Sequence, residues 1–221
     1  VISMSKPQAS EAAILERNGI ALENVVKQSE IASLMEEHGY DSTEISKGKA
    51  LHEEALRVSR KNKNEGDEAG EAYKIFAGIY VRLDDLYSRD RKKAKIVFRE
   101  DPVTLKKLEL TGTIPQAYVA WQKTVANFYS TLNAEPELID KLKRLKITAE
   151  SVAAAITLVE QIKTARAAYL KEKGESEDAT KEKDAAFAKM DKWMSDFYAV
   201  ARIALEDKPQ LLEALGKIVK S

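Results

Sequence analysis

The chain has 221 residues, a length that suffices for two domains of about 100 residues, each able to bury a core. It carries 36 Lys and Arg and 36 Asp and Glu, so its formal charge is zero and no overall field attracts nucleic acid or an anionic membrane. Cysteine is absent, which excludes disulfides, thiolate nucleophiles and cysteine-ligated zinc.

Apolar periodicity predicts two helices in the first third of the chain. The first extends from Ala9 to about Ser29, and Ile31, Leu34 and Met35 continue its apolar pattern to Gly39. Gly39 is the expected stop, because glycine adopts the left-handed conformation of a helix C-terminus without steric cost. The second begins after Asp41 and extends to about Lys63. Asp41 is its expected N-cap, since Glu44 follows at the spacing of a capping box.

The sequence is organised around a long helix predicted over residues 67–101. A polar turn at 62–67 precedes this helix and favours an antiparallel path for it. Its apolar residues recur at steps of three and four, and Pro102 ends it because a residue before proline is pushed out of the helical region. Pro102 also starts a short helix over 103–108, which Gly112 ends.

The second half of the chain repeats this order of elements. Pro115 opens a helix with the most regular apolar seam in the sequence, which consists of Tyr118, Trp121, Val125, Phe128 and Leu132. Thr148 is the expected N-cap of a helix that ends near Tyr169, and a turn is predicted over 171–176. The remaining predicted helices are a long one at 177–207 and short ones at 137–145 and 210–215.

A shift of 107 positions aligns the two halves. Residues 41–110 match residues 148–217 at 13 of 70 positions, including Leu51/Leu158, Ala94/Ala201 and Pro102/Pro209. We interpret this as an internal duplication.

The expected fold is therefore all-α, with two tandem three-helix units, 1–112 and 113–221, in which short proline-started helices connect long antiparallel ones. One bundle of all six long helices is the alternative. In repeat length and helix count the arrangement resembles the spectrin-type repeat, from which the proline-started connectors differ.

Sequence patterns for enzymatic or metal chemistry are absent. His38 and His52 do not follow a Glu at the Glu-x-x-His spacing of di-iron bundles, and neither Gly-x-Ser-x-Gly nor a glycine-rich phosphate loop occurs. Asp84, Asp85 and Asp191 are conceivable metal ligands that we expect to face solvent. We therefore assign no catalytic, cofactor-binding or metal-binding residue and expect no enzyme activity.

The run from Arg89 to Lys95 is the most concentrated charge in the chain, and Arg82 and Arg99 extend it. A basic stripe on a helix can bind phosphates. A nucleic-acid-associated helical protein is therefore an alternative function, although a solvated outer face is the simpler interpretation of these residues.

Aromatic residues at three-four spacing predict core packing rather than a cofactor site. We expect Trp121 in the core. Trp193 is expected at the flank of a core, because it adjoins the seam residue Met194, and at a flank it would meet another helix or subunit.

Asp90 occupies a seam position at which the second half has Phe197. A buried carboxylate is costly unless it is paired. We therefore expect the first unit to be open here, with Asp90 hydrated or paired with Arg91 or Lys93. The competing interpretation is a functional pocket.

These features predict a non-enzymatic structural or interaction protein that binds one or more protein partners, without a cofactor. A metal- or ligand-binding bundle is the third hypothesis, and the oligomeric state is open. No stretch reaches the roughly 18 apolar residues of a membrane span. The lack of cysteine favours a reducing compartment, so the cytoplasm is the expected location; a signal peptide removed before Val1 would leave no trace in this sequence.

Overall fold

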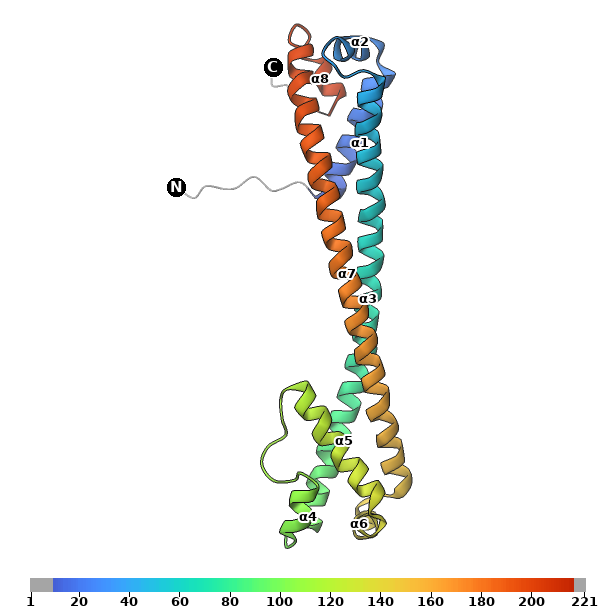
Figure 1. Ribbon diagram of the computed structural model, residues 1–221, viewed down its shortest axis with the longest axis vertical. Coiled ribbons are helices and arrows are strands. Elements are labelled where there is room, and N and C mark those ends of the chain that lie inside the picture. The colour runs from blue at the N-terminus through green and yellow to red at the C-terminus, as the bar shows by residue number, and fades with distance from the viewer. Residues whose placement is uncertain (1–9, 217–221) are drawn as a thin grey trace, which may run out of the picture. The chain divides into compact units, whose positions relative to one another are not determined.

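Helices make up the fold of this computed structural model, which describes residues 10–216 (Figure 1). The two longest are α3 (Ser42–Val97) and α7 (Ala149–Ala204), with 56 residues each. The others are α1 (Glu11–Lys27), α2 (Ser29–Glu37), α4 (Pro102–Lys107), α5 (Tyr118–Ala134), α6 (Pro136–Leu142), the 3-10 helix η1 (Lys143–Leu145) and α8 (Leu211–Ala214). Residues 10–216 contain no strand, so the all-α prediction is confirmed. The expected helix start at Ala9 lies outside the described residues.

Both long helices run through the places where the sequence predicts hairpin turns. α3 is helical across 62–67 and α7 is helical across 171–176, so each half has one long helix where two were expected. The predicted turns are wrong because these polar segments contain Gly66 and Gly174 but no proline. A glycine costs a helix about 1 kcal/mol and does not end it.

The chain divides into two compact units, and each unit combines both halves of the sequence. Unit 1 contains residues 1–66 and 175–221, and unit 2 contains residues 67–174. The expected boundary between 112 and 113 falls inside unit 2, in the connection between α4 and α5. The observed division therefore differs from the expected one, because α3 and α7 each begin in one unit and end in the other.

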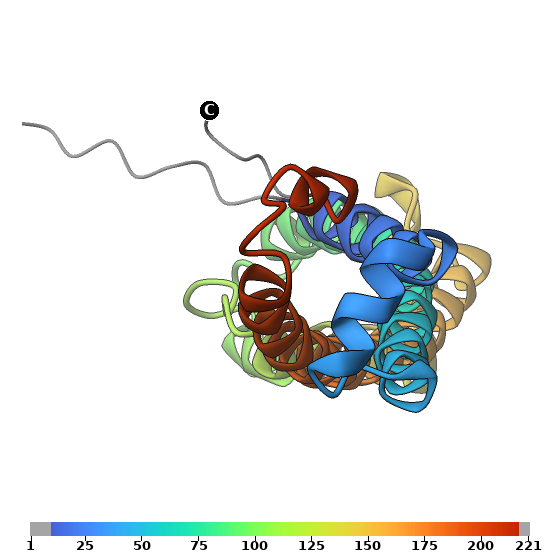
Figure 2. The ribbon, with the colours of Figure 1, turned by 90° about the horizontal axis from the view of Figure 1, so that it is seen from above.

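Unit 1 is built from α1, α2, α8, the first part of α3 and the last part of α7 (Figures 1 and 2). Where α1 packs against α3, the Nε2 atom of His52 lies 2.8 Å from the carbonyl oxygen of Leu15. Where α3 and α7 pack together, Trp193 Nε1 donates to Glu44 at 2.9 Å. The Trp193 ring covers Gly48, at which a Cβ atom would lie 2.3 Å from the ring. The core includes Leu22, Val25, Ile31, Met35, Met194 and Phe197.

Unit 2 is built from α4, α5, α6, η1, the last part of α3 and the first part of α7. Arg91 of α3 fixes the connection that follows α4, because its guanidinium donates to the carbonyl oxygens of Leu110 and Gly112 at 3.1 and 2.9 Å. The core includes Leu83, Tyr87, Phe98, Trp121, Phe128 and Ile162.

The backbone repeats at the same spacing as the sequence. α1 and α5 have 17 residues each and α3 and α7 have 56 each, and the members of each pair start 107 residues apart. A single non-helical residue separates two helices at Gln28 and again at Glu135. Left-handed backbone recurs at two pairs of equivalent positions, Gly39/Lys146 and Glu109/Gly216. The long helices, the breaks between helices and these left-handed residues thus recur 107 residues apart within residues 10–216.

Several predicted helix ends are confirmed. Asp41 accepts hydrogen bonds from two backbone N–H groups at the start of α3, and Thr148 accepts one at the start of α7. Pro102 starts α4 and Pro136 starts α6. The break between α1 and α2 at Gln28 lies close to the expected end of the first helix at about Ser29, although neither proline nor glycine marks it.

Asp90 is buried, which contradicts the open bundle expected at this position. It is 4% exposed, and its carboxylate accepts hydrogen bonds from the Tyr129 hydroxyl at 3.1 Å and from the Lys93 ammonium at 3.4 Å. Burial, and then the charge of Asp90, raise the pKa of Tyr129, so its hydroxyl stays protonated and donates. The expected pairing with Lys93 is present, but inside a closed core. The equivalent positions in unit 1 are Phe197 and Leu22, both buried.

The fragments 1–112 and 113–221 are each expected to lack cooperative folding, because each supplies only part of both cores. An equimolar mixture should recover a cooperative helical melt, since all elements of both cores are then present. Circular dichroism melts of each fragment and of the mixture measure this. A fragment 1–112 that melts cooperatively as a monomer would contradict the observed division.

Asp90→Phe is expected to destabilise the chain by about 2 kcal/mol or more, because it leaves the Tyr129 hydroxyl without an acceptor and overfills the site. The double variant Asp90→Phe/Tyr129→Leu, which copies the Phe197 and Leu22 pair, should recover most of this loss. Denaturant unfolding of both single variants and of the double variant measures the coupling. A neutral or stabilising Asp90→Phe would show that the pair does not support the core.

Candidate functional site

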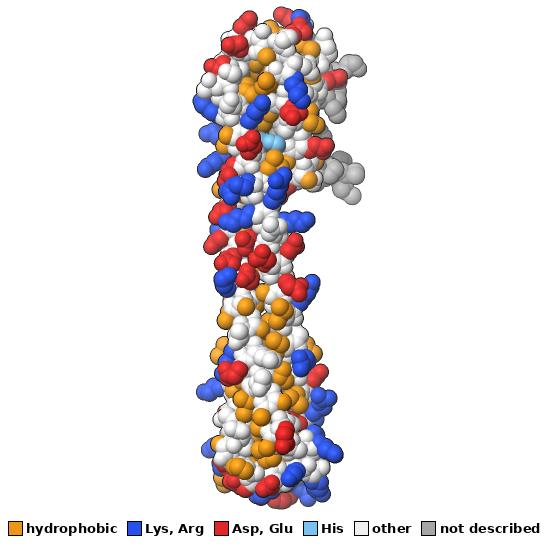
Figure 3. Space-filling view, turned by 90° about the vertical axis from the view of Figure 1, so that its right-hand side faces the viewer, with side chains coloured by type: hydrophobic (Ala, Val, Ile, Leu, Met, Phe, Trp, Pro, Cys, Tyr) orange, Lys and Arg blue, Asp and Glu red, His pale blue; other side chains and the backbone are white. Residues whose placement is uncertain are grey.

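Aromatic side chains gather in unit 2 where α3, the start of α5 and α7 meet. The set comprises Tyr73, Phe76 and Tyr80 of α3, Tyr118 and Trp121 of α5, and Tyr169 of α7, with Arg166 among them; we call it the aromatic cluster. The three α3 members are spaced by three and four residues and therefore share one face of the helix. Hydrophobic side chains are frequent on the face of unit 2 that Figure 3 shows.

The rings of the cluster form a continuous series of contacts. The centroid of Phe76 lies 5.6 Å from that of Tyr118 and 6.0 Å from that of Tyr169, and the Phe76 and Tyr169 rings are stacked with an interplanar angle of 6°. The centroids of Tyr80 and Trp121 are 4.5 Å apart. These separations are typical of favourable aromatic pairs.

Burial changes steeply across the cluster. Trp121 is 1% exposed, and its Nε1–H donates to Asp84 at 2.7 Å. Tyr73 is 52% exposed, and two aliphatic neighbours in sequence, Ile75 and Leu170, are 54% and 49% exposed. The cluster therefore has a buried anchor and an exposed apolar margin.

Arg166 adds a positive charge to this surface. The guanidinium carbon lies 3.9 Å from the ring centroid of Tyr118 and 5.8 Å from that of Phe76, which is cation–π geometry. Burial raises the pKa of Tyr118, and the charge of Arg166 opposes this effect. No carboxylate within residues 10–216 forms an ion pair with Arg166, so its charge is available to a ligand.

Unit 1 holds a polar pair where unit 2 has two of these aromatic residues. The positions equivalent to Tyr73 and Tyr169 are Thr180 and Asn62. Their side chains form a hydrogen bond of 2.8 Å between α3 and α7. In unit 2 the two tyrosine rings make the same helix contact, at 5.3 Å between centroids.

A second aromatic pair of unit 2 is also replaced by polar side chains in unit 1. The positions equivalent to Phe76 and Tyr118 are Lys183 and Glu11, which form an ion pair of 2.6 Å between α7 and α1. The fold therefore makes both contacts without aromatic side chains. Its helix packing does not require the aromatic cluster, which is a property of unit 2 in particular.

The sequence-based predictions for the two tryptophans agree with their places in the structure. Trp121 is in the core, and Trp193 is half-buried at the flank of the unit 1 core, against Gly48 and Tyr40. The cluster as a set was missed, because its members come from three helices. The available signal was the comparison at a shift of 107, which aligns aromatic residues such as Phe76 with polar ones.

The basic run from Arg89 to Lys95 does not form one exposed stripe. Arg91 is buried and holds two backbone carbonyl oxygens, and Lys93 bonds to Asp90. Arg89 and Lys92 are exposed. Nucleic-acid binding through this run stays a prediction that rests on fewer exposed cations than the sequence suggests.

The side chains weighed as metal ligands have other contacts or face solvent. His38 and His52 each lie 2.8 Å from a backbone carbonyl oxygen. Asp84 accepts the indole N–H described above, and Asp85 and Asp191 are exposed. These five side chains therefore supply no argument for a metal site.

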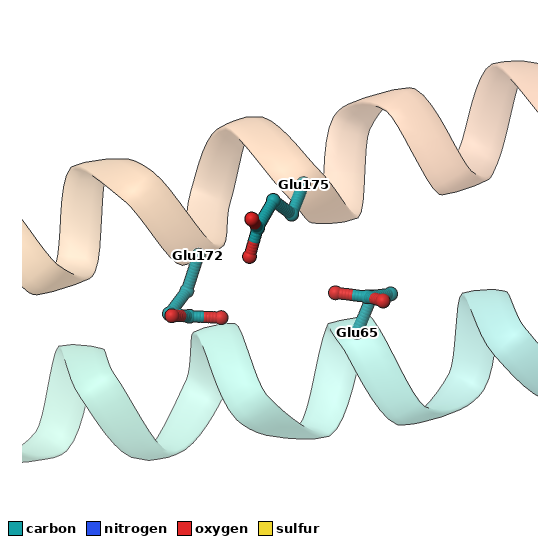
Figure 4. Close-up of side chains that lie close together, drawn as sticks. All are labelled: Glu65, Glu172 and Glu175. Carbon is teal, nitrogen blue, oxygen red and sulfur yellow. The ribbon is translucent and has the colours of Figure 1, made fainter.

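Two glutamates of unit 1, Glu65 of α3 and Glu175 of α7, have carboxylate oxygens within 4.8 Å of each other (Figure 4). The figure also labels Glu172, one turn earlier on α7, whose carboxylate pairs with Lys171 at 3.0 Å. Acidic groups on neighbouring helices are common without an ion, and this proximity alone carries no metal assignment.

Comparison with known proteins gives no match: no family model matches the chain, and no curated protein or solved structure is significantly similar to it. None of the helices described for residues 10–216 is long and apolar enough to cross a membrane.

Proposed function

We propose that this protein is a non-enzymatic interaction protein whose unit 2 binds a protein partner through the aromatic cluster. One observation carries the proposal: at equivalent positions of the same fold, unit 2 has aromatic pairs where unit 1 has polar ones. Aromatic residues needed only for packing would be buried, yet Tyr73 is 52% exposed, and the aliphatic Ile75 and Leu170, next in sequence to Phe76 and Tyr169, are also about half exposed. A partner that covers these side chains would remove their apolar surface from water, which is favourable for binding.

The residue types of the cluster suit a protein partner. Tyr, Trp and Arg are enriched among the residues that dominate the energetics of protein interfaces. Here Trp121 is a buried member of the cluster, Tyr73 is an exposed one, and Arg166 supplies a planar cation. A partner that presents aliphatic side chains to the rings and a carboxylate to Arg166 matches this arrangement.

We further infer that the two halves arose by duplication of a segment of about 107 residues and then diverged. Three observations support this inference: α1 and α5 have equal lengths, α3 and α7 have equal lengths, and left-handed residues recur at equivalent positions. The duplication makes unit 1 a reference for unit 2, because it shows which side chains suffice for the fold.

The variant Tyr73→Thr/Tyr169→Asn places the polar pair of unit 1 into unit 2. It is expected to keep the fold, at a cost near 1 kcal/mol, because the same pair of side chains joins α3 and α7 in unit 1. It should lose at least about tenfold in affinity for a partner captured by the wild-type chain, since it removes an exposed interface residue and its neighbour. Capture from an extract of the source cells, followed by titration of the captured protein, measures the effect.

The matched control is Asn62→Ala/Thr180→Ala, which alters the equivalent pair in unit 1 and should leave the affinity unchanged. A partner that binds the Tyr73→Thr/Tyr169→Asn variant as tightly as wild type would remove the aromatic cluster from the proposal.

A further inference from the structure

The regions where the long helices lead into the short ones carry opposite charges in the two units. We call residues 89–107 and 135–146 of unit 2 the basic end, and the equivalent residues 196–214 and 28–39 of unit 1 the acidic end. The basic end has 12 Lys and Arg against 6 Asp and Glu, whereas the acidic end has 2 against 7. Two further lysines follow the acidic end in the sequence, outside the described residues.

Each end is held together by contacts between its two segments. In the basic end, Lys107 of α4 donates to Glu135, which directly precedes α6, at 2.7 Å. In the acidic end, Lys208, between α7 and α8, pairs with Glu30 of α2. The two segments of each end therefore contact each other within their own unit.

The charge reversal occurs position by position. Five exposed cations of the basic end have exposed carboxylates at the equivalent positions of the acidic end: Arg89/Asp196, Arg99/Glu206, Lys106/Glu213, Lys143/Glu36 and Arg144/Glu37. One pair, Asp101/Lys208, runs the other way, and there Asp101 is occupied as the N-cap of α4. The same backbone thus presents nearly complementary charges in the two units.

These charges are mostly not neutralised within the chain. Of the ten side chains in the five pairs, Arg99 alone has an ion pair among residues 10–216, with its neighbour Glu100 at 3.3 Å. Apolar side chains are exposed beside them: Ile96 and its equivalent Ile203 are each 62% exposed, and Val103 is 73% exposed. Both ends therefore combine free charge with apolar surface, as protein interfaces do.

We propose that the chain associates with itself head to tail, the basic end of one copy binding the acidic end of the next. Because the two ends share one backbone geometry, they can meet across a local two-fold axis, where cations of one end lie opposite carboxylates of the other and the exposed Ile96 and Ile203 contribute apolar surface. Two basic ends, or two acidic ends, repel each other. Each copy has one end of each kind, so the contact leaves a free end and builds an open chain or a ring.

A second copy is the partner that explains both ends at once. Nucleic acid or an anionic membrane would be attracted to the basic end and would leave the acidic end without a role. The inference rests on surfaces other than the aromatic cluster and is independent of the function proposed for that cluster.

The association is expected to depend strongly on salt, because exposed charges are screened. It should be present at an ionic strength of about 0.01 M, where the Debye length is about 30 Å, and largely lost at about 1 M, where it is about 3 Å. Sedimentation velocity over a range of protein concentrations at both ionic strengths measures this.

Two charge-reversal variants test the pairing of the ends. Arg99→Glu/Lys106→Glu/Arg144→Glu lowers the net charge of the basic end from +6 to zero, and Glu206→Lys/Glu213→Lys/Glu37→Lys raises that of the acidic end from −5 to +1. Each variant alone is expected to associate at least tenfold more weakly than wild type, and an equimolar mixture of the two should associate again. The control Arg60→Glu/Lys63→Glu/Lys123→Glu makes the same charge change at exposed residues outside both ends and should associate like wild type. Circular dichroism melts show whether each variant keeps its fold.

Three results would overturn the proposal. The wild-type chain could sediment as a monomer at every concentration at low ionic strength, the two variants could each associate like wild type, or their mixture could stay monomeric. A monomeric wild-type chain that binds a phosphate resin in a salt-dependent manner would indicate an anionic partner for the basic end instead.

Discussion

Both cores of this protein form only because α3 and α7 are unbroken helices of 56 residues. Each of these helices passes from one compact unit into the other, so each core contains side chains from both halves of the sequence. Hydrophobic burial is the dominant favourable term in folding, and here it is available only when both halves are present. Neither half of the sequence is therefore a folding unit by itself. Each unit needs the first part of one long helix and the last part of the other.

The two cores differ at positions that contact each other, and a difference in one half of the sequence is matched by a difference in the other half. In unit 1 the large Trp193 ring rests on Gly48, whereas the equivalent positions in unit 2 are Leu86 and Ala155. In unit 2 the Tyr129 hydroxyl binds Asp90, whereas unit 1 has Leu22 and Phe197 at these positions. A half that paired with a second copy of itself would place Asp90 opposite Leu22, which has no hydroxyl to offer. Close packing makes such mismatches costly, so the two halves favour each other over themselves.

Local signals in the sequence predicted the features that depend on neighbouring residues. Asp41 and Thr148 cap helices and Pro102 starts one, because each acts on the backbone within a few residues of itself. The turns at 62–67 and 171–176 were predicted wrongly, since a polar segment with one glycine suits an exposed helix as well as a turn. The burial of Asp90 and the aromatic cluster depend on side chains from other helices. Periodicity within one helix carries no information about such partners, although the shift of 107 residues already aligned the aromatic positions with polar ones.

Hydrogen exchange of Trp121→Ala tests the division into units most directly. Truncation of this buried side chain should cost about 3 to 5 kcal/mol and should promote local unfolding of the unit that contains it. Amide exchange measured by mass spectrometry should then accelerate in residues 67–97 and 118–165 and stay slow in 15–58 and 187–204. Acceleration throughout 118–204, with 83–97 as protected as in the wild-type chain, would contradict the account, because it would mean that each half of the sequence unfolds as a unit of its own.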